Sequence, residues 1–514
     1  MVSSDVSTVG QITQLPRHSR RELCARLARL AGAAEPIPEV PPFGLIRDGD
    51  RQGLPDDAID AYPLGQVQLG MIFHMMRDNA KSRNRGIPAA YHNVGTQHYR
   101  ISEFSEAAFR ESVKILVDRH EIFRTSFHIS GFSEAIAIVH RACPSRITVF
   151  DLRRKSEQEK HELLAEFQAA QNATIVDLRD APLIRFYVHV FTDHDIKLTV
   201  VEPHSISDGW STHLTLAELI GNYHRIMAGE KVADPPLQLA YRQFIAEERA
   251  AVSSDAQRLF WHAFLANASD TKLPTRRVNP PGGERCKFYS ALDKSLTHDV
   301  LELAKAQGLP TRTVLLAAHF KLLSLLSGSE DVLTGVSFNG RLEKPDGTEL
   351  RGMFLNTLPM RLESMGHSWV KLLSGVYATE CMILPFRRYP LSEILRAVGR
   401  EMLPSTLFSF HHFHSVRRIQ GMGVVDSMEN ITDESRTNFP FEAAFLRSAE
   451  RADVFTMIID VDPDRFTSSD VETFANMYCE ILTMMTQDVH ASHEKFAAPQ
   501  CLGYRTLDGQ FGKE

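Results

Sequence analysis

The sequence predicts an α/β protein of two lobes, and three observations support this fold class. The chain has 514 residues, which is more than one ordinary hydrophobic core accommodates. Its hydrophobic content of 43% and charged content of 24% are typical of a globular protein. Helical and strand patterns occur together in both halves, which indicates two α/β lobes of about 200 residues each. We therefore divide the chain into residues 1–60 (N-terminal helix and Pro-rich linker), 61–235 (N-terminal lobe), 236–492 (C-terminal lobe) and 493–514 (start of a linker to a following domain).

Charge and cysteine content argue against several classes of protein. The formal net charge of -7 and the lack of a basic stripe interleaved with aromatic residues indicate no nucleic-acid partner. Six cysteines are scattered without CxxC pairs, which fits a reducing cytoplasm and predicts no metal site. No apolar run approaches the roughly 20 residues that span a bilayer, and the first residues lack a signal-peptide core. We therefore expect a cytoplasmic protein without a membrane span.

Residues 1–60 resemble an appendage to the globular body. Ser19 followed by Glu22 predicts a capping-box start, and leucines then recur at helical spacing up to Gly32. A Pro-rich connector follows. Two interpretations remain open: a surface helix that packs on the body, or a docking element left from an inter-domain linker.

Residues 61–235 alternate between helix and strand patterns. Ser105 is expected to cap an amphipathic helix. Alternation from Ile122 to Ile129 predicts a strand with every second residue, Ile129 included, on one face. Residues 183–191 and 196–202 are expected to form paired strands across a polar turn, and a further amphipathic helix follows Gly209.

Residues 236–492 repeat this mixture. One long helix is expected from about Tyr241 to Leu265, followed by a loop rich in Pro and Gly at 274–284. Helices are expected on either side of Gly308, and strands at 332–338 and 353–361. Periodicity is lost from about Ser492, which predicts a linker.

The segment from Pro203 to Gly209 follows directly after an apolar strand. A histidine just past a strand end lies where loops carry function on a rigid scaffold. The adjoining Asp208-Gly209 adds a tight turn and a carboxylate that can fix local geometry. A lone histidine at a strand end is more often structural, so the residues themselves leave both roles open for His204.

A second feature is the segment from Asp118 to Phe127, in which Arg124 lies among large apolar residues. A charge buried there without a partner would be costly. We therefore expect Arg124 to have a carboxylate partner.

Together these segments resemble the condensation domains of nonribosomal peptide synthetases. His204 to Ser211 is similar to the family's His-His-x-x-x-Asp-Gly-Trp-Ser motif, and residues 118–127 are similar to its Arg-His-Glu-x-x-Arg-Thr-x-Phe motif. Further segments that resemble family motifs, in the family's order, are 62–71, 241–244, 335–341, 351–357, 388–391, 408–414 and 437–440. The resemblance spans about Tyr62 to Asp488.

The resemblance implies two chloramphenicol-acetyltransferase-like lobes arranged in a V as a pseudo-dimer. It implies an acyltransferase in which the amine of a carrier-bound aminoacyl acceptor attacks the thioester of an acyl donor. The partners would be donor and acceptor carrier proteins, with an adenylation domain downstream. Substrates would ride on the phosphopantetheine of the carriers or on coenzyme A, so no covalently bound cofactor is expected.

The resemblance also implies roles for individual residues. His204 is the active-site histidine, which accepts the proton of the amine or orients it, and the backbone N–H of Gly209 is a candidate contact for the oxyanion. Asp208 is expected to pair with Arg124 or Arg341 and to hold the loop. The candidates to line a substrate tunnel are Ser207, Trp210, Ser211 and Asn356, and for Asn356 a structural role is equally open.

Pro203 departs from the family motif, because it replaces the first histidine of the pair. Proline removes a backbone donor and restricts Glu202 to extended geometry, which suits a residue that leaves a strand. The chemistry then rests on His204 alone. A non-catalytic domain that recruits partners is an alternative.

The type of condensation domain also has alternatives. The opening methionine and residues 70–74 and 410–414 favour a starter domain, which attaches a fatty acyl group to the first amino acid of a lipopeptide (lipoinitiation). The main alternative accepts a peptidyl donor and uses residues 1–60 for docking. An epimerization domain shares the fold, but Asn356-Thr357 favours condensation. A heterocyclization domain would carry Asp in place of His204.

Overall fold

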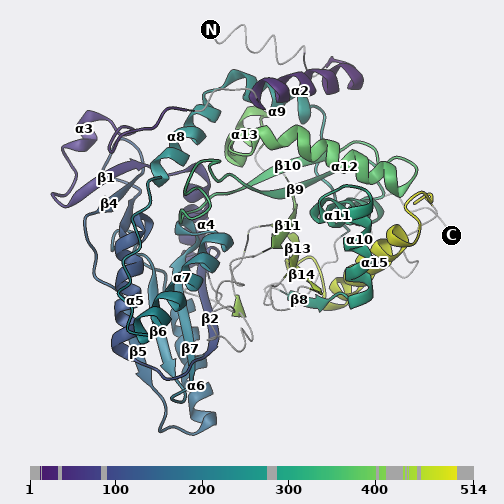
Figure 1. The fold of residues 1–514 in the computed structure, drawn as a ribbon. Helices are drawn as coiled ribbons and strands as arrows, with labels where there is room; N and C mark the ends of the chain where they lie inside the picture. Colours follow the sequence, from purple (N-terminus) through teal and green to yellow (C-terminus); the bar gives the residue numbers. More distant parts are fainter. Residues whose placement is uncertain are drawn as a thin grey trace.

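The structure is a computed structural model. It describes residue 12 and residues 14–32, 37–82, 89–274, 286–400, 404–412, 432–433, 437, 439–447 and 453–494. Most of the loop expected at 274–284 and of the linker expected at 493–514 lies outside these ranges, as do parts of 408–414 and 437–440. The described residues form two α/β lobes, each with its own hydrophobic core (Figure 1). This confirms the predicted fold class.

The first lobe is built on a five-stranded sheet in the order β12-β2-β7-β6-β5. The strands are β2 (His92–Arg100), β5 (Ile147–Asp151), β6 (Arg185–Val190), β7 (Asp195–Pro203) and β12 (Thr432–Asp433). The helices of this lobe are α4 (Gln66–Ser82), α5 (Glu106–Arg119), α6 (Glu157–Asn172) and α7 (Gly209–Met227), of which α5 packs against α7. A smaller sheet joins β1 (Ala58–Pro63), β4 (Ile136–His140) and β3 (Thr125–His128).

The expected strand pair of the first lobe is present. Strands β6 and β7 run antiparallel, with Val190 opposite Ile196. Strand β7 lies between β6 and β2 in the sheet. Its last six residues are all buried, so both faces of the strand are covered there. The position of Pro203, the last residue of the strand, is therefore fixed at the end of the sheet.

The second lobe carries a six-stranded sheet in the order β10-β9-β11-β13-β14-β8. The strands are β8 (Cys286–Ala291), β9 (Val332–Asn339), β10 (Leu355–Leu362), β11 (Thr406–His412), β13 (Phe441–Arg447) and β14 (Phe455–Val461). The helices are α8 (Tyr241–Val252), α9 (Asp255–Phe264), α10 (Lys294–Ala306), α11 (Thr311–Ser327), α12 (Trp369–Ile383), α13 (Leu391–Ala397) and α15 (Ser468–Gln487). Short elements elsewhere are α3 (Asp48–Arg51), η1 (Glu121–Arg124), η2 (His204–Ile206) and η3 (Leu384–Phe386).

The two lobes exchange parts of the chain. Strand β12 comes from the second half of the sequence but pairs with β2, at the edge of the first lobe's sheet. Tyr241 and Phe244 of α8, together with Phe354, also pack in the first lobe's core. The division at residues 235 and 236 stays a prediction.

Two expected elements differ from the structure. The strand predicted for 122–129 begins only at Thr125, because Glu121–Arg124 form a 3₁₀ turn, and Ile129 is 45% exposed rather than buried. The single helix predicted for 241–265 is two helices. The break falls at Ser253-Ser254, where the Ser254 side chain accepts a hydrogen bond from the Gln257 N–H and caps α9.

Helix α2 (Arg17–Gly32) packs on the second lobe, where it contacts α9 (Figure 1). Cys24 and Leu27 are buried there in the second lobe's core. The helix begins two residues before Ser19, so the predicted capping box at Ser19 is wrong. Its end at Gly32 is as expected. This packing favours the first interpretation of the segment, a helix that belongs to the body.

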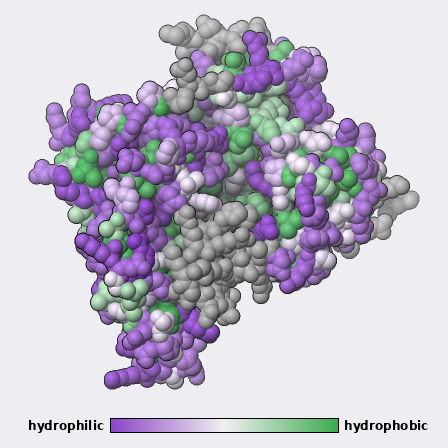
Figure 2. Space-filling view, in the orientation of Figure 1, coloured by the Kyte–Doolittle hydropathy of each residue, from purple (hydrophilic) through white to green (hydrophobic). Residues whose placement is uncertain are grey.

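Hydrophilic residues cover most of the outer surface that Figure 2 shows on both lobes. Among the described helices, none is by itself both long and apolar enough to cross a bilayer. Helices α10 and α11 meet that test only as a pair bent by 110°, and most of α11 is buried in the core.

The packing of α2 makes a stability prediction with a control on the same helix. Leu27→Ala removes a side chain that is 8% exposed, and we expect it to lower the free energy of unfolding by about 2 kcal/mol or more. Leu30→Ala changes a leucine that is 58% exposed and is expected to cost less than about 0.5 kcal/mol. Urea unfolding of the full chain measures both. Equal effects would contradict the packing of α2 on the body.

Candidate active site

His204 lies where β7 ends and the 3₁₀ turn η2 begins. Its backbone N–H donates to the carbonyl of Tyr91 (2.8 Å), just before β2. Tyr91 has a φ of 60°, a left-handed conformation that is costly for a bulky residue and is maintained only by its surroundings. The two neighbouring strands thus fix the backbone of His204.

The side chain of His204 is fixed by a hydrogen bond within the same loop. Its Nδ1 lies 2.6 Å from the carbonyl oxygen of Ser207. A carbonyl oxygen only accepts, so Nδ1 carries the hydrogen in this contact and Nε2 of the neutral ring keeps its lone pair. His204 is half-buried, and Nε2 is the ring nitrogen that the Ser207 contact does not use.

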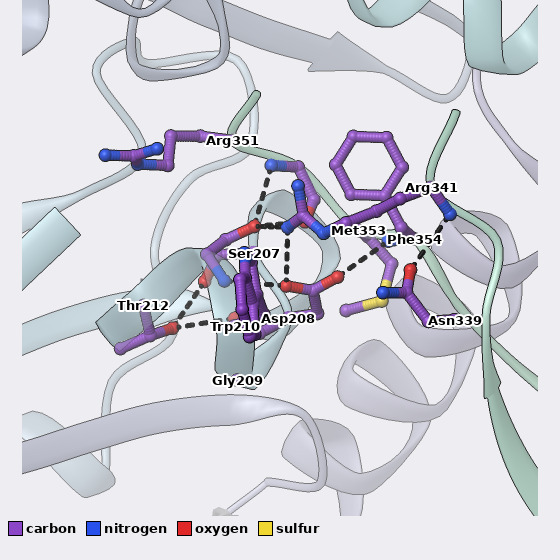
Figure 3. A network of polar contacts seen from close by, with 12 residues as sticks. Ser207, Asp208, Gly209, Trp210, Thr212, Asn339, Arg341, Arg351, Met353 and Phe354 are labelled. Atoms are coloured by element: carbon purple, nitrogen blue, oxygen red, sulfur yellow. Dashed lines mark hydrogen bonds and ion pairs between the residues drawn. The ribbon is translucent and has the colours of Figure 1, made fainter. Parts of the chain in front are cut away.

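Asp208 ties this loop to the second lobe (Figure 3). It caps α7, because its Oδ1 accepts from the Ser211 N–H at 2.7 Å. The same carboxylate pairs with Nη2 of Arg341 (3.1 Å) and accepts from the Phe354 N–H (3.2 Å). Asp208 is 1% exposed and Arg341 6%, so this is a buried ion pair. Of the two partners expected for Asp208, the structure selects Arg341.

Ser211 and Gly352 complete this connection. The Ser211 hydroxyl donates to the carbonyl of Gly352 (2.8 Å) and accepts from Arg341 (2.6 Å), and the Asp208 N–H donates to the same carbonyl (3.1 Å). Position 352 requires glycine, because a Cβ atom there would lie 2.4 Å from the ring of Tyr241. The start of α7 and the segment 352–354 are therefore locked together.

Arg124 does not join this network, and among the described residues its hydrogen bonds go to backbone carbonyls rather than to the carboxylate that was expected. Its guanidinium donates to the backbone carbonyls of Val117 (3.2 Å), His140 (2.6 Å) and Arg141 (3.1 Å). Three carbonyl acceptors bind the buried guanidinium, and its charge also acts on the buried carboxyl of Glu121, whose pKa burial raises. Arg124 thus joins α5 to β4 inside the first lobe.

The four tunnel candidates all make hydrogen bonds within the protein. Asn356 donates to the carbonyls of Arg387 (3.0 Å) and Tyr389 (2.7 Å) and accepts from the Leu391 N–H (3.3 Å). Trp210 donates to the carbonyl of Thr348 (3.0 Å). Ser207 and Ser211 are buried and bonded to their neighbours. These contacts favour structural roles, and a lining role for these residues stays a prediction.

Three side chains that support the site were not predicted from the sequence. Gln68 of α4 donates to the carbonyl of Ser205 at 2.8 Å and so supports η2. Glu202 is buried beside the loop, and Glu218 of α7 receives three donors. The available signal for both glutamates was a carboxylate inside an otherwise apolar strand or helix face, which requires a partner when it is buried.

Glu218 binds three basic side chains at once. Its carboxylate accepts from Arg119 (2.8 Å), His120 (2.9 Å) and Arg351 (2.7 Å). Burial opposes its ionisation, but the hydrogen bond from His120 and the charges of Arg351 and Arg119 lower the pKa of Glu218 to about 2. The carboxylate therefore joins α5, α7 and the segment that precedes Gly352. Within the described ranges, no group of three His, Cys, Asp or Glu side chains is placed to hold a metal ion.

The structure thus holds His204 on a loop that a buried Asp–Arg pair joins to chain from the second half of the sequence. Residues 58–500 match the sequence model of the Condensation domain family. The chain therefore belongs to the condensation domain family. In nonribosomal peptide synthetases this family consists of acyltransferases that form amide bonds.

Two relatives illustrate the family. The chain is 30% identical over 486 residues to the AMB antimetabolite synthetase AmbE of Pseudomonas aeruginosa. The aligned region covers 91% of this chain and 22% of AmbE. It is 28% identical over 400 residues to tyrocidine synthase 3 of Brevibacillus parabrevis. That alignment covers 75% of this chain and 6% of the synthase. The chain thus corresponds to a small part of each of these relatives.

Solved structures share the fold. The condensation domain of the monacolin K polyketide synthase MokA superposes with a TM-score of 0.70 and 16% identity, over 85% of this chain and all of that one. The first condensation domain of the calcium-dependent antibiotic synthetase gives 0.69 and 16%, over 86% and all of that chain. The starter condensation domain of the rhizomide synthetase RzmA gives 0.67 and 15%, over 87% and 99%.

The buried ion pair at the loop predicts a large effect on stability. Asp208→Ala leaves the Arg341 charge buried without its partner, so we expect the free energy of unfolding to fall by about 3–5 kcal/mol. Asp118→Ala, which breaks an exposed pair with Lys114, serves as the control and should cost about 1 kcal/mol or less. Chemical unfolding compares the two variants. An Asp208→Ala protein as stable as wild type would contradict the structural role of Asp208.

Glu218 makes stability depend on pH in a known direction. Its pKa in the folded state is below that in the unfolded chain, so its contribution is present above about pH 4.5 and is lost as pH falls towards 2. We expect Glu218→Gln to remove much of the loss that wild type shows on acidification from pH 5 to pH 3. Glu106→Gln, in an exposed pair with Arg110, should keep the wild-type dependence. The free energy of unfolding at each pH is the measurement, and parallel curves for wild type and Glu218→Gln would refute the assignment.

Proposed function

We propose that this chain joins an acyl thioester to the amine of a carrier-bound aminoacyl group, with His204 as the catalytic residue. The carrying observation is the geometry of the His204 loop, in which the Nδ1 contact with Ser207 leaves Nε2 as the free basic atom. The donor and acceptor arrive on the phosphopantetheine of carrier proteins, or the donor arrives on coenzyme A. We propose that the chain works in a cytoplasmic synthetase, in which an adenylation domain follows the condensation domain.

The reaction uses one base and one site for negative charge. The amine nitrogen attacks the thioester carbonyl, so a C–N bond forms and the carbonyl oxygen becomes an oxyanion. Nε2 of His204 takes the proton that the amine loses. Collapse of the tetrahedral intermediate breaks the C–S bond, and the departing thiolate takes the proton from the His204 imidazolium, which yields a thiol and restores the neutral ring. Because thioesters are already activated, placing the two reactants together supplies much of the rate, up to roughly 7–11 kcal/mol in favourable cases.

The start of α7 is the proposed site for the oxyanion. Gly209 is the first residue of this 19-residue helix, and N–H groups in a helix's first turn have no acceptor within the helix. The glycine lets a substrate approach its backbone closely. The buried Asp208 holds this turn in place without touching the substrate.

A starter-type donor, a fatty acyl group for lipopeptide synthesis, is the finer part of the proposal. A row of rings leads from α4 to His204, with centroid separations of 5.5 Å from Phe73 to His74, 6.1 Å from His74 to Tyr91 and 6.2 Å from Tyr91 to His204. Phe73 is 62% exposed, so its end of the row offers apolar surface to a hydrocarbon chain. A peptidyl donor is the competing assignment.

The activity test is amide formation on a carrier, detected by intact mass. Fatty acyl-coenzyme A and an acyl carrier are offered as donors, a peptidyl carrier is offered in parallel, and the acceptor is an aminoacyl carrier. We expect product with a fatty acyl donor and a fall of at least about a hundredfold in rate for His204→Ala, because that variant lacks the base. His161→Ala, which changes an exposed histidine of α6, should keep the wild-type rate.

The outcomes separate the alternatives. Product from the peptidyl donor alone would reject the starter assignment and keep the condensation activity. No product from any donor would favour a domain that recruits partners. Product at the wild-type rate from His204→Ala would reject the role of His204.

A further inference from the structure

Glu202 is a buried acid directly before Pro203, at the end of β7. Glu202 is 3% exposed, and its backbone lies opposite Asn93 of β2 in the sheet. Burial raises the pKa of Glu202, although the Ser207 hydroxyl and the nearby His204 act in the opposite direction. The proposed reaction mechanism assigns this carboxyl group no role. A buried acid is costly to maintain, so its contacts indicate what it does.

Glu202 contacts the residue that orients His204. Its Oε1 accepts a hydrogen bond from the Ser207 hydroxyl, and Thr212 Oγ1 lies 3.2 Å from the same oxygen. The Ser207 and Thr212 hydroxyls are also 3.0 Å apart. Ser207 therefore uses its side chain to bind Glu202 and its carbonyl to receive the Nδ1 hydrogen of His204. One residue links the buried carboxylate to the imidazole.

Among the described residues around His204, Glu202 is the carboxylate that Ser207 connects to the imidazole. Asp208 also acts on Glu202, and its charge is matched by Arg341. His74 reaches the site through Tyr91, and His92 lies opposite Pro203 on β2. Burial lowers the pKa of both histidines, which disfavours their charged forms.

We propose that Glu202 is a positioning residue for His204: it holds the Ser207 carbonyl in place and, in its ionised form, supplies negative charge to the imidazolium that forms when His204 takes the amine's proton. This inference rests on the proposed function, in which His204 acts as the base. It gives Glu202 and Ser207 a part in the rate of the reaction that a merely structural pair would not have.

Glu202→Gln tests the charge while it keeps an oxygen that can accept from Ser207. We expect kcat to fall by about tenfold or more, because the imidazolium loses the opposite charge beside it, while KM for the aminoacyl carrier stays within about twofold. The acidic limb of the pH–rate profile should move to lower pH, because the imidazolium loses a nearby opposite charge. Glu248→Gln is the matched control. Glu248 is also buried, its pKa is raised by burial to about 7, and it accepts from the Gln66 N–H rather than from the His204 loop.

A second variant tests the route through Ser207. Ser207→Ala removes the hydroxyl and keeps the carbonyl, and we expect its loss in kcat to resemble that of Glu202→Gln. In the double variant the two losses should not add, because both substitutions break one link. Additive losses would overturn the proposal. So would a Glu202→Gln enzyme with wild-type kcat and pH profile, or one in which KM alone changes.

NMR titration of the full chain with ¹³C-labelled histidine separates this inference from the proposed function, because it needs no turnover. The His204 signal is assigned by its loss in His204→Ala. We expect its titration midpoint to be lower in Glu202→Gln than in wild type and unchanged in Glu248→Gln. An unchanged midpoint in Glu202→Gln overturns the role of Glu202, even if wild type makes the amide. A lowered midpoint supports that coupling even if no donor yields product.

Discussion

The buried pair of Asp208 and Arg341 is the interaction on which the candidate site depends. It joins the first turn of α7 to the segment 352–354, and so joins the first lobe's loop to chain from the second half of the sequence. The cost of burying both charges is offset in part because Ser211 hydrogen-bonds to each of them. The guanidinium of Arg341 also lies over the Phe354 ring, 4.2 Å from its centroid. The pair thereby fixes where α7 begins.

The remaining contacts place one free atom. Strand β7 fixes Pro203, the Tyr91 carbonyl fixes the His204 backbone, and the Ser207 carbonyl fixes the imidazole. Each of these uses a backbone group, which varies little in position between residue types. The loop can therefore tolerate proline where the family's motif has a first histidine, because the contacts that hold His204 do not require a side chain at position 203.

Local elements were predictable from the residues, whereas long-range partners mostly were not; Arg341, one of the two partners that the resemblance implied for Asp208, is the exception. The β6–β7 pair and the helix after Gly209 follow from apolar periodicity, and the family motifs indicated His204 and Asp208. A carboxylate bonded to Arg124 was expected, but among the described residues its hydrogen bonds go to carbonyls, because sequence shows a buried cation and not which carbonyls surround it. The helix break at Ser254 was missed because apolar spacing continues through it. Glu202 was missed because its hydrogen bond with Ser207 depends on how the loop folds back over the strand end, which the sequence does not show.

The central claim is that the protein presents His204 with hydrogen on Nδ1 and a lone pair on Nε2. The ¹⁵N chemical shifts of the His204 ring in the folded, neutral protein measure this tautomer directly. We predict a protonated-type shift for Nδ1 and an unprotonated-type shift for Nε2 at a pH where the ring is neutral. The reverse assignment, or equal averaged shifts that indicate a freely exchanging ring, would contradict it.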